Sequence, residues 1–164
     1  MAAVLITGMS ATGKSTVLAE LERRGHAVVD TDAGGWIETV RLADGGAEPM
    51  WREDRIAALL SEHAGTALFV AGCVANQGRF YPRFRAVVLL SVPQDVLVER
   101  LAARTTNDFG RSNEERARVL ADLRNVEPLL RQRATAEIDT RRPLDEVADE
   151  LERLAGITPR RPAP

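Results

Sequence analysis

The segment from Gly8 to Ser15 combines two glycines, a lysine and a serine at spacings that could hold a polyphosphate. It reads GMSATGKS and matches G-x-x-x-x-G-K-[ST], the phosphate-binding or Walker A loop, at every fixed position. Glycines let the backbone curl so that its N–H groups and a helix N-terminus face an anion. Lys14 would neutralise β- and γ-phosphate oxygens during catalysis and the Ser15 hydroxyl would bind Mg²⁺, which predicts ATP and Mg²⁺ as cofactors. The predicted ATP-binding residues of this loop are Gly8, Met9, Ser10, Ala11, Thr12, Gly13, Lys14, Ser15 and Thr16.

Lys14 is the only lysine of the chain, because 21 of its 22 basic residues are arginines. A sequence that otherwise uses arginine and keeps one lysine indicates a position where arginine does not serve. The same count argues against a GTPase, since the guanine-reading motif of that class needs a further lysine.

Two aspartates, Asp30 and Asp32, follow a short apolar run and form a second group of reactive side chains. They straddle one residue at the end of an extended segment, so both carboxylates can lie near the phosphates if the chain turns there. Large mechanochemical ATPases place carboxylates after the strand beside the phosphate-binding loop, whereas the later apolar runs of this chain end in Gly72 and Pro93. The alternative that the aspartates only cap a following helix stays open.

Short apolar runs that alternate with helical spacing are the elements that must position these side chains. Strands are predicted at residues 3–7, 27–29, 67–71, 86–92 and 135–139. Helices are predicted at residues 15–24, 36–42, 51–63, 96–104, 113–133 with a break near Pro128, and 143–154, and a loop is predicted at 44–49. Five strands that alternate with helices predict a doubly wound α/β sheet whose ligand lies at the carboxyl ends of the strands. We expect one domain over 1–156 and an unstructured tail over 157–164.

The chain has 164 residues, a net charge of −2 and one cysteine, Cys73. This length suits one domain, and the single cysteine excludes an intrachain disulfide and suits a reducing compartment, so we expect a cytoplasmic protein. The scattered basic residues argue against a nucleic-acid partner. The sequence contains no signal peptide and no run of about 18 apolar residues, so we expect no membrane partner.

The sequence resembles the small P-loop kinases of the shikimate kinase, gluconate kinase and adenylate kinase superfamily over most of its length. The resemblance rests on the phosphate-binding loop, on the acidic Asp-x-Asp that follows it, and on four further segments. These segments are Trp51-Arg52-Glu53, residues 98–104, residues 124–130 and Ile138-Asp139-Thr140. The resemblance implies a P-loop NTPase fold with a five-stranded parallel sheet, helices on both faces and a short lid at about 105–112.

The resemblance also implies a role for each matching residue. Asp30 would hold Mg²⁺ or its waters together with Ser15, and Asp32 would orient the acceptor hydroxyl and remove its proton. Arg52 and Gly72 would contact the acceptor, which is expected to be a small molecule. A closing lid would exclude water from the reaction. The arginines implied in closure are Arg104 at ATP, Arg111 in catalysis and Arg124 at the acceptor.

The acceptor itself is less constrained than the phosphate donor. Shikimate kinases carry three consecutive glycines after the third strand, whereas this chain keeps only Gly72 before Cys73. The segment 80–84, FYPRF, instead resembles small nuclear-type adenylate kinases and their ATPase relatives, which favours a nucleoside or nucleotide acceptor. A shikimate- or gluconate-like metabolite, an acceptor-independent ATPase switch on a larger assembly, and a nucleotide sensor without turnover stay open, as does the oligomeric state.

Overall fold

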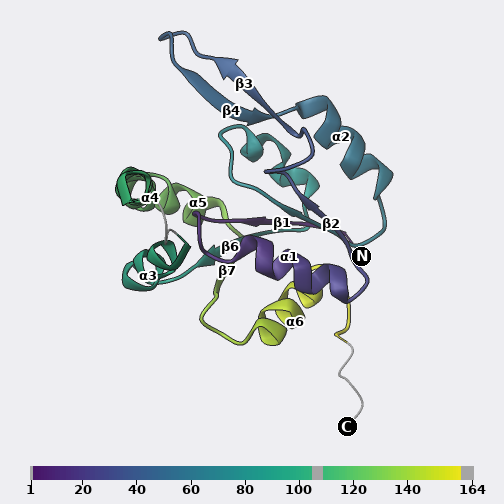
Figure 1. Ribbon diagram of the computed structural model, residues 1–164. Helices are drawn as coiled ribbons and strands as arrows, with labels where there is room; N and C mark the ends of the chain where they lie inside the picture. Colours follow the sequence, from purple (N-terminus) through teal and green to yellow (C-terminus); the bar gives the residue numbers. More distant parts are fainter. Residues whose placement is uncertain (1, 105–108, 160–164) are drawn as a thin grey trace.

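The computed structural model describes residues 2–104 and 109–159 (Figure 1). Within these ranges, the side chains of residues 104 and 109–112 are not described. A five-stranded sheet in the order β2-β5-β1-β6-β7 forms its centre, and every neighbouring pair of strands is parallel. The strands are β1 (Ala3–Thr7), β2 (Ala27–Asp30), β5 (Leu68–Ala71), β6 (Ala86–Ser91) and β7 (Ala136–Asp139). This confirms the predicted α/β fold and its five parallel strands.

Helices cover both faces of the sheet because successive strand residues point to opposite sides. On one face Val4 and Ile6 pack with α1 (Lys14–Arg23) and α6 (Leu144–Leu154). On the other face Leu5 packs with α2 (Glu53–Glu62) and with the 3₁₀ helix η1 (Gln77–Arg83). The central strands β5 and β6 are buried along their whole length, as expected for a parallel sheet covered on both sides.

Three further helices lie at the end of the sheet that carries the phosphate-binding loop. They are α3 (Gln94–Arg104), α4 (Phe109–Asn125) and α5 (Glu127–Arg133). Val126 separates the last two, so the expected break of a long helix near Pro128 is confirmed. The predicted lid at about 105–112 begins in residues 105–108, which lie outside the described part of the chain, and its remainder opens α4.

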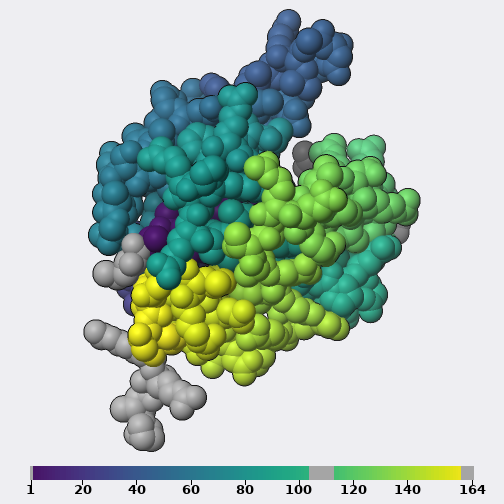
Figure 2. Space-filling view, turned by 180° about the vertical axis from the view of Figure 1, so that it is seen from behind, coloured from purple at the N-terminus to yellow at the C-terminus, as the bar shows by residue number. Residues whose placement is uncertain are grey.

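The prediction of a helix at 36–42 is wrong, and the loop predicted at 44–49 is confirmed only at 44–46, in the turn of a hairpin. These residues form a two-stranded antiparallel sheet, β3 (Ile37–Arg41) with β4 (Ala47–Trp51). Its turn is closed by a 2.8 Å hydrogen bond from the Leu42 N–H to the Gly46 carbonyl oxygen, and Gly45 takes a φ of 87°. The β-branched residues of β3 favour an extended chain, and the pairing partner supplied by β4 decides the outcome. The hairpin projects from the body at the end remote from α6 (Figure 2).

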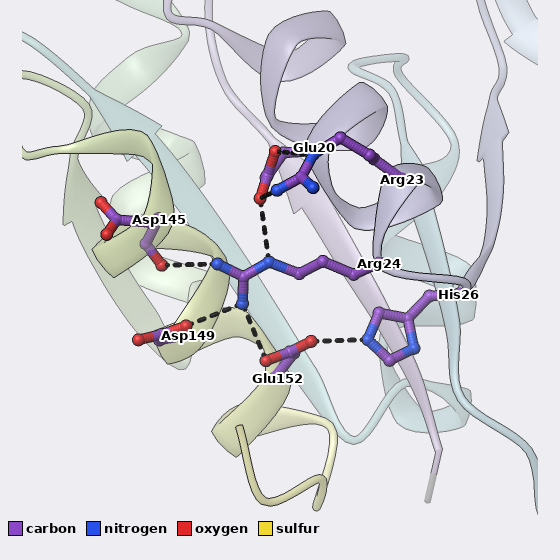
Figure 3. A network of polar contacts seen from close by, with 7 residues as sticks. All are labelled: Glu20, Arg23, Arg24, His26, Asp145, Asp149 and Glu152. Carbon is purple, nitrogen blue, oxygen red and sulfur yellow. Dashed lines mark hydrogen bonds and ion pairs between the residues drawn. The ribbon is translucent and has the colours of Figure 1, made fainter. Parts of the chain in front are cut away.

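A polar network joins the end of α1 to α6 (Figure 3). The Nη1 atom of Arg24 lies 2.7 Å from Oδ1 of Asp149 and 3.0 Å from Oε2 of Glu152. The Nε atom of Arg24 lies 3.0 Å from Oε1 of Glu20. The other oxygen of Glu152 lies 2.6 Å from Nε2 of His26. Glu152 is buried, so these partners provide the charge compensation that a buried carboxylate requires.

In the described part of the chain we find no helix that is long and apolar enough to cross a membrane.

Candidate active site

The loop between β1 and α1 lies at the carboxyl end of β1, and two of its glycines are required by the backbone. Gly13 precedes the first residue of α1 with a φ of 102°, in the left-handed region that favours glycine. Gly8 has a φ of 149°, and a Cβ atom there would lie 2.5 Å from the Leu90 carbonyl oxygen. Gly8 is therefore required where the loop passes close to β6, and Gly13 is required where α1 begins.

Lys14 lies across this loop. Its Nζ atom donates hydrogen bonds to the carbonyl oxygens of Gly8 at 2.5 Å and Met9 at 3.0 Å. Met9 is buried against Leu89 and Leu130, and it anchors the loop to the α4–α5 end of the molecule. The ammonium is thus held beside the N-terminus of α1, where backbone N–H groups and the helix dipole favour an anion.

The acidic pair lies next to the first turn of α1. The Ser15 hydroxyl Oγ lies 3.4 Å from Oδ2 of Asp30, and Oδ1 of Asp30 accepts a 3.0 Å hydrogen bond from the Asp32 N–H. Between the two aspartates, buried Thr31 donates to the Ala71 carbonyl oxygen at 2.8 Å. Thr31 thereby fixes the turn that leaves the carboxylates at the surface of the loop. The oxygens of Ser15 and Asp30 fit Mg²⁺, which takes one or two protein oxygen ligands and completes its shell with phosphate and water.

A cavity of about 270 Å³ opens between the phosphate-binding loop and the acidic turn. Besides loop residues it is lined by Asp32, Cys73 and Asp122. Burial raises the pKa of the Cys73 thiol, so the thiol stays protonated and has little nucleophilic character at neutral pH. Asp122, on α4, was not singled out from the sequence, because nothing local in an arginine-rich helix indicates which residue faces a loop more than a hundred positions earlier.

A second cavity, of about 330 Å³, lies on the other side of the same loop. It is lined by Ala11, Gly13, Thr16, Val17, Arg100, Ala103, Thr140, Arg142, Leu144 and Val147. Arg100 Nη1 donates to the Ala11 carbonyl oxygen at 3.2 Å, and the Thr140 hydroxyl donates to the Thr12 carbonyl oxygen at 2.6 Å. No individual role was predicted for Arg100 or Thr140, although both lie in segments that resemble the small P-loop kinases. A sequence signal was present only for Thr140, which follows a predicted strand and so lies at the sheet edge where ligands bind.

The remaining predicted residues lie apart from the two cavities. Arg52 precedes α2, and its Nη1 atom lies 3.5 Å from Oε2 of Glu38 on the hairpin. Arg124 is exposed on α4 and does not line the described cavities. A Cβ at Gly72 would collide with the Thr31 hydroxyl, so this glycine permits close packing of the acidic turn. The side chains of Arg104 and Arg111 lie outside the described part of the structure.

Comparison with known proteins agrees with the fold. A family profile described as an AAA domain matches residues 4–121. Shikimate kinase from Bacteroides thetaiotaomicron is similar in structure, with a TM-score of 0.58, 18% identity, and coverage of 95% of this chain and 99% of that chain. Shikimate kinase from Acinetobacter baumannii in complex with shikimate gives a TM-score of 0.56, 17% identity, and coverage of 94% and 90%. TT1252 from Thermus thermophilus gives a TM-score of 0.54 and 20% identity, with coverage of 92% of this chain and 97% of that chain. No curated protein matches the sequence.

Proposed function

This chain belongs to the AAA domain family of P-loop proteins, and on that basis we propose that it transfers the γ-phosphoryl group of ATP to a hydroxyl group of a small molecule. The observation that carries the proposal is the pair of cavities on either side of the phosphate-binding loop, which share Ala11 and Gly13. A nucleotide whose triphosphate follows the loop has room for its nucleoside on one side and for an acceptor on the other. Phosphoryl transfer needs this in-line arrangement of donor and acceptor.

The cavity beside Arg100 suits the nucleoside. Apolar side chains of Val17, Leu144 and Val147 provide a surface for a base, and the Thr140 hydroxyl and the Arg100 guanidinium provide polar groups at its rim. Ligand sites commonly combine an apolar lining with a few polar groups that fix orientation. This cavity supports the proposal because a triphosphate alone would not require it.

The cavity beside Asp32 suits the acceptor. The hydroxyl oxygen of the acceptor attacks the γ-phosphorus, the bond to the oxygen bridging the β- and γ-phosphates breaks, and Asp32 takes the hydroxyl proton. Lys14 neutralises the charge that develops on the phosphate oxygens. Mg²⁺ held by Ser15 and Asp30 would supply further neutralisation.

The projecting hairpin favours a second candidate function. The hairpin β3–β4 buries little of itself, and of its residues only Trp51 is fully covered. Two strands alone are marginally stable in water, so a hairpin of this kind could be completed by a partner protein. In that case the chain would be an ATPase switch on a larger assembly, with slow ATP hydrolysis that needs no acceptor.

The two candidates are separated by measuring ADP release from Mg²⁺-ATP with and without acceptors. The panel contains nucleosides, nucleoside monophosphates, shikimate, gluconate and hydroxylated antibiotics. Release that one acceptor class stimulates, together with a phosphorylated product, supports the phosphotransferase. Steady release without any phosphorylated product contradicts it and supports the switch.

A further inference from the structure

The charged side chains that line the acceptor cavity in the described part of the structure are mostly acidic. Its described lining contains three ionisable groups that carry charge at neutral pH, namely Lys14, Asp32 and Asp122. The Cys73 thiol adds no charge, because burial raises its pKa. Lys14 and Asp122 line the same cavity as this thiol. Both side chains are therefore close enough to the cavity interior to influence what binds there.

The single positive charge is committed to the phosphate donor. Lys14 lies against the Gly8 and Met9 carbonyl oxygens, at the N-terminus of α1. The net negative charge of Mg²⁺-ATP exceeds the charge of this one ammonium. An acceptor entering beside Asp32 and Asp122 therefore meets two carboxylates and the phosphates of the donor.

Four arginines of the surrounding elements are engaged with other groups. Arg55 donates to the Gly35 carbonyl oxygen at 2.6 Å, and its guanidinium lies 4.3 Å from the ring centroid of Trp36. Arg133 lies 4.7 Å from the ring centroid of Tyr81. Arg52 pairs with Glu38 and Arg79 pairs with Glu53. Among the described side chains none of these guanidiniums lines the cavity, so none is placed to hold a carboxylate or phosphate of an acceptor.

We infer that the acceptor is a hydroxyl compound that carries a protonated amine, such as an amino sugar, an aminocyclitol or an amino nucleoside. This inference rests on the proposed phosphotransferase function and names the substrate class of the same site. The acceptor hydroxyl binds Asp32, and the ammonium group binds Asp122 through a charge-assisted hydrogen bond. A carboxylate or phosphate on the acceptor would be repelled by the same two groups, which is the usual way in which a site rejects a wrong ligand.

Two series of related acceptors, each with a member that carries an ammonium group, a neutral member and an anionic member, test the inference. One series is glucosamine, glucose and gluconate, and the other is 5′-amino-5′-deoxyadenosine, adenosine and adenosine 5′-monophosphate. Phosphorylated product is measured by mass spectrometry at pH 7 with saturating Mg²⁺-ATP. We expect the amine of at least one series to give kcat/KM about tenfold or more above its neutral partner, and the anion to be poorest.

The variant Asp122→Asn keeps the size of the side chain and removes its charge. We expect KM for the amine acceptor to rise about tenfold, KM for the neutral analogue to stay the same, and KM for ATP to stay the same. Asp54→Asn, at an exposed position in the first turn of α2, is the matched control and should change none of these values. A rise in KM for the amine acceptor that does not appear for the neutral analogue distinguishes charge recognition from a general structural effect.

The outcomes separate the inference from the function on which it rests. Efficient phosphorylation of gluconate or adenosine 5′-monophosphate, with the amines poorest, overturns the inference and leaves the phosphotransferase intact. An Asp122→Asn variant that keeps the wild-type preference for the amine overturns the role given to Asp122. Acceptor-independent ADP release with no phosphorylated product from any member of either series overturns both the function and the inference.

Discussion

The Arg100 guanidinium donates a 3.1 Å hydrogen bond from Nη1 to the Thr140 hydroxyl, and both side chains also bond the backbone of the phosphate-binding loop. Arg100 reaches the Ala11 carbonyl oxygen, and Thr140 reaches the Thr12 carbonyl oxygen. The loop is thus held from outside by one residue of α3 and one residue that follows β7. Because such loops bind phosphate through backbone N–H groups, fixing their carbonyl oxygens helps to keep the N–H groups aimed at the ligand.

Removing this support should weaken ATP binding. In Arg100→Met the loss of hydrogen bonds to the loop should raise KM for ATP about tenfold, since a hydrogen bond to a charged group contributes about 1.5 kcal/mol or more. We expect kcat to change less, because Arg100 does not contact the cavity beside Asp32. Steady-state kinetics checks this, with the exposed Arg153→Met as control. An unchanged KM for ATP would show that the loop keeps its conformation without Arg100.

Lys14→Ala tests the phosphate-binding loop itself. Loss of the ammonium removes the positive charge that neutralises the phosphate oxygens and should lower kcat/KM for ATP by about 10²-fold or more. Circular dichroism and thermal unfolding of the variant separate this effect from misfolding. A variant that retains wild-type turnover would contradict the role given to Lys14.

The sheet and the phosphate-binding loop could be predicted because their signals are local. Residues 86–92 form one apolar run, and the loop motif needs only eight consecutive positions. The hairpin could not be predicted in the same way. Ile37 and Val40 are three positions apart, a spacing typical of one face of a helix. The pairing of Ile37 with Trp51 depends on residues that are distant in sequence. Tertiary pairing decided the structure of this segment.

The same distinction applies to the site. Ser15 and Asp30 were predicted to share a metal ion, and in the structure their oxygens lie 3.4 Å apart. Arg100 lies 89 positions after Ala11 in the chain, so only the packing of α3 brings them together. Asp122 reaches the cavity through the orientation of α4. Roles that depend on how a helix is rotated against the sheet carry no local sequence signal.

Asp32→Asn tests the proton acceptor. The amide keeps the size of the side chain but cannot take a proton, so kcat should fall by about 10²-fold or more, as is typical for loss of a general base. The affinity for ATP, measured by calorimetry, should stay close to that of the wild type. An unchanged kcat would return Asp32 to a structural role at the end of β2.

The polar network between α1 and α6 should dominate the stability of that side of the molecule. Arg24→Met leaves the buried Glu152 carboxylate with His26 as its one remaining partner of those described. Removing one member of a buried charge network is strongly destabilising, so we expect the free energy of unfolding to fall by about 2–4 kcal/mol. Denaturant unfolding measures this, and Arg153→Met serves again as the exposed control. A loss below about 0.5 kcal/mol, the range of ordinary surface substitutions, would contradict it.

Glu20 should make stability depend on pH. Hydrogen bonds from Arg23 and Arg24 lower the pKa of Glu20 from 4.5 to about 2 in the folded protein. Its contribution is therefore fully present above pH 4.5 and is lost as the pH falls toward 2, because the unfolded chain takes up the proton first. Unfolding curves of Glu20→Gln should lose part of this dependence, whereas the exposed Glu22→Gln on the same helix should keep it. Equal slopes for both variants would contradict the assignment.

The most direct test of the central claim follows the γ-phosphoryl group itself. With γ-³²P-labelled ATP, Mg²⁺ and 5′-amino-5′-deoxyadenosine or glucosamine as acceptor, we expect label in the phosphorylated acceptor in a one-to-one ratio with ADP. We expect the rate of that transfer to fall by about 10²-fold or more in Lys14→Ala and in Asp32→Asn. Label that appears only as inorganic phosphate, at a rate that no acceptor changes, would contradict phosphoryl transfer by this site.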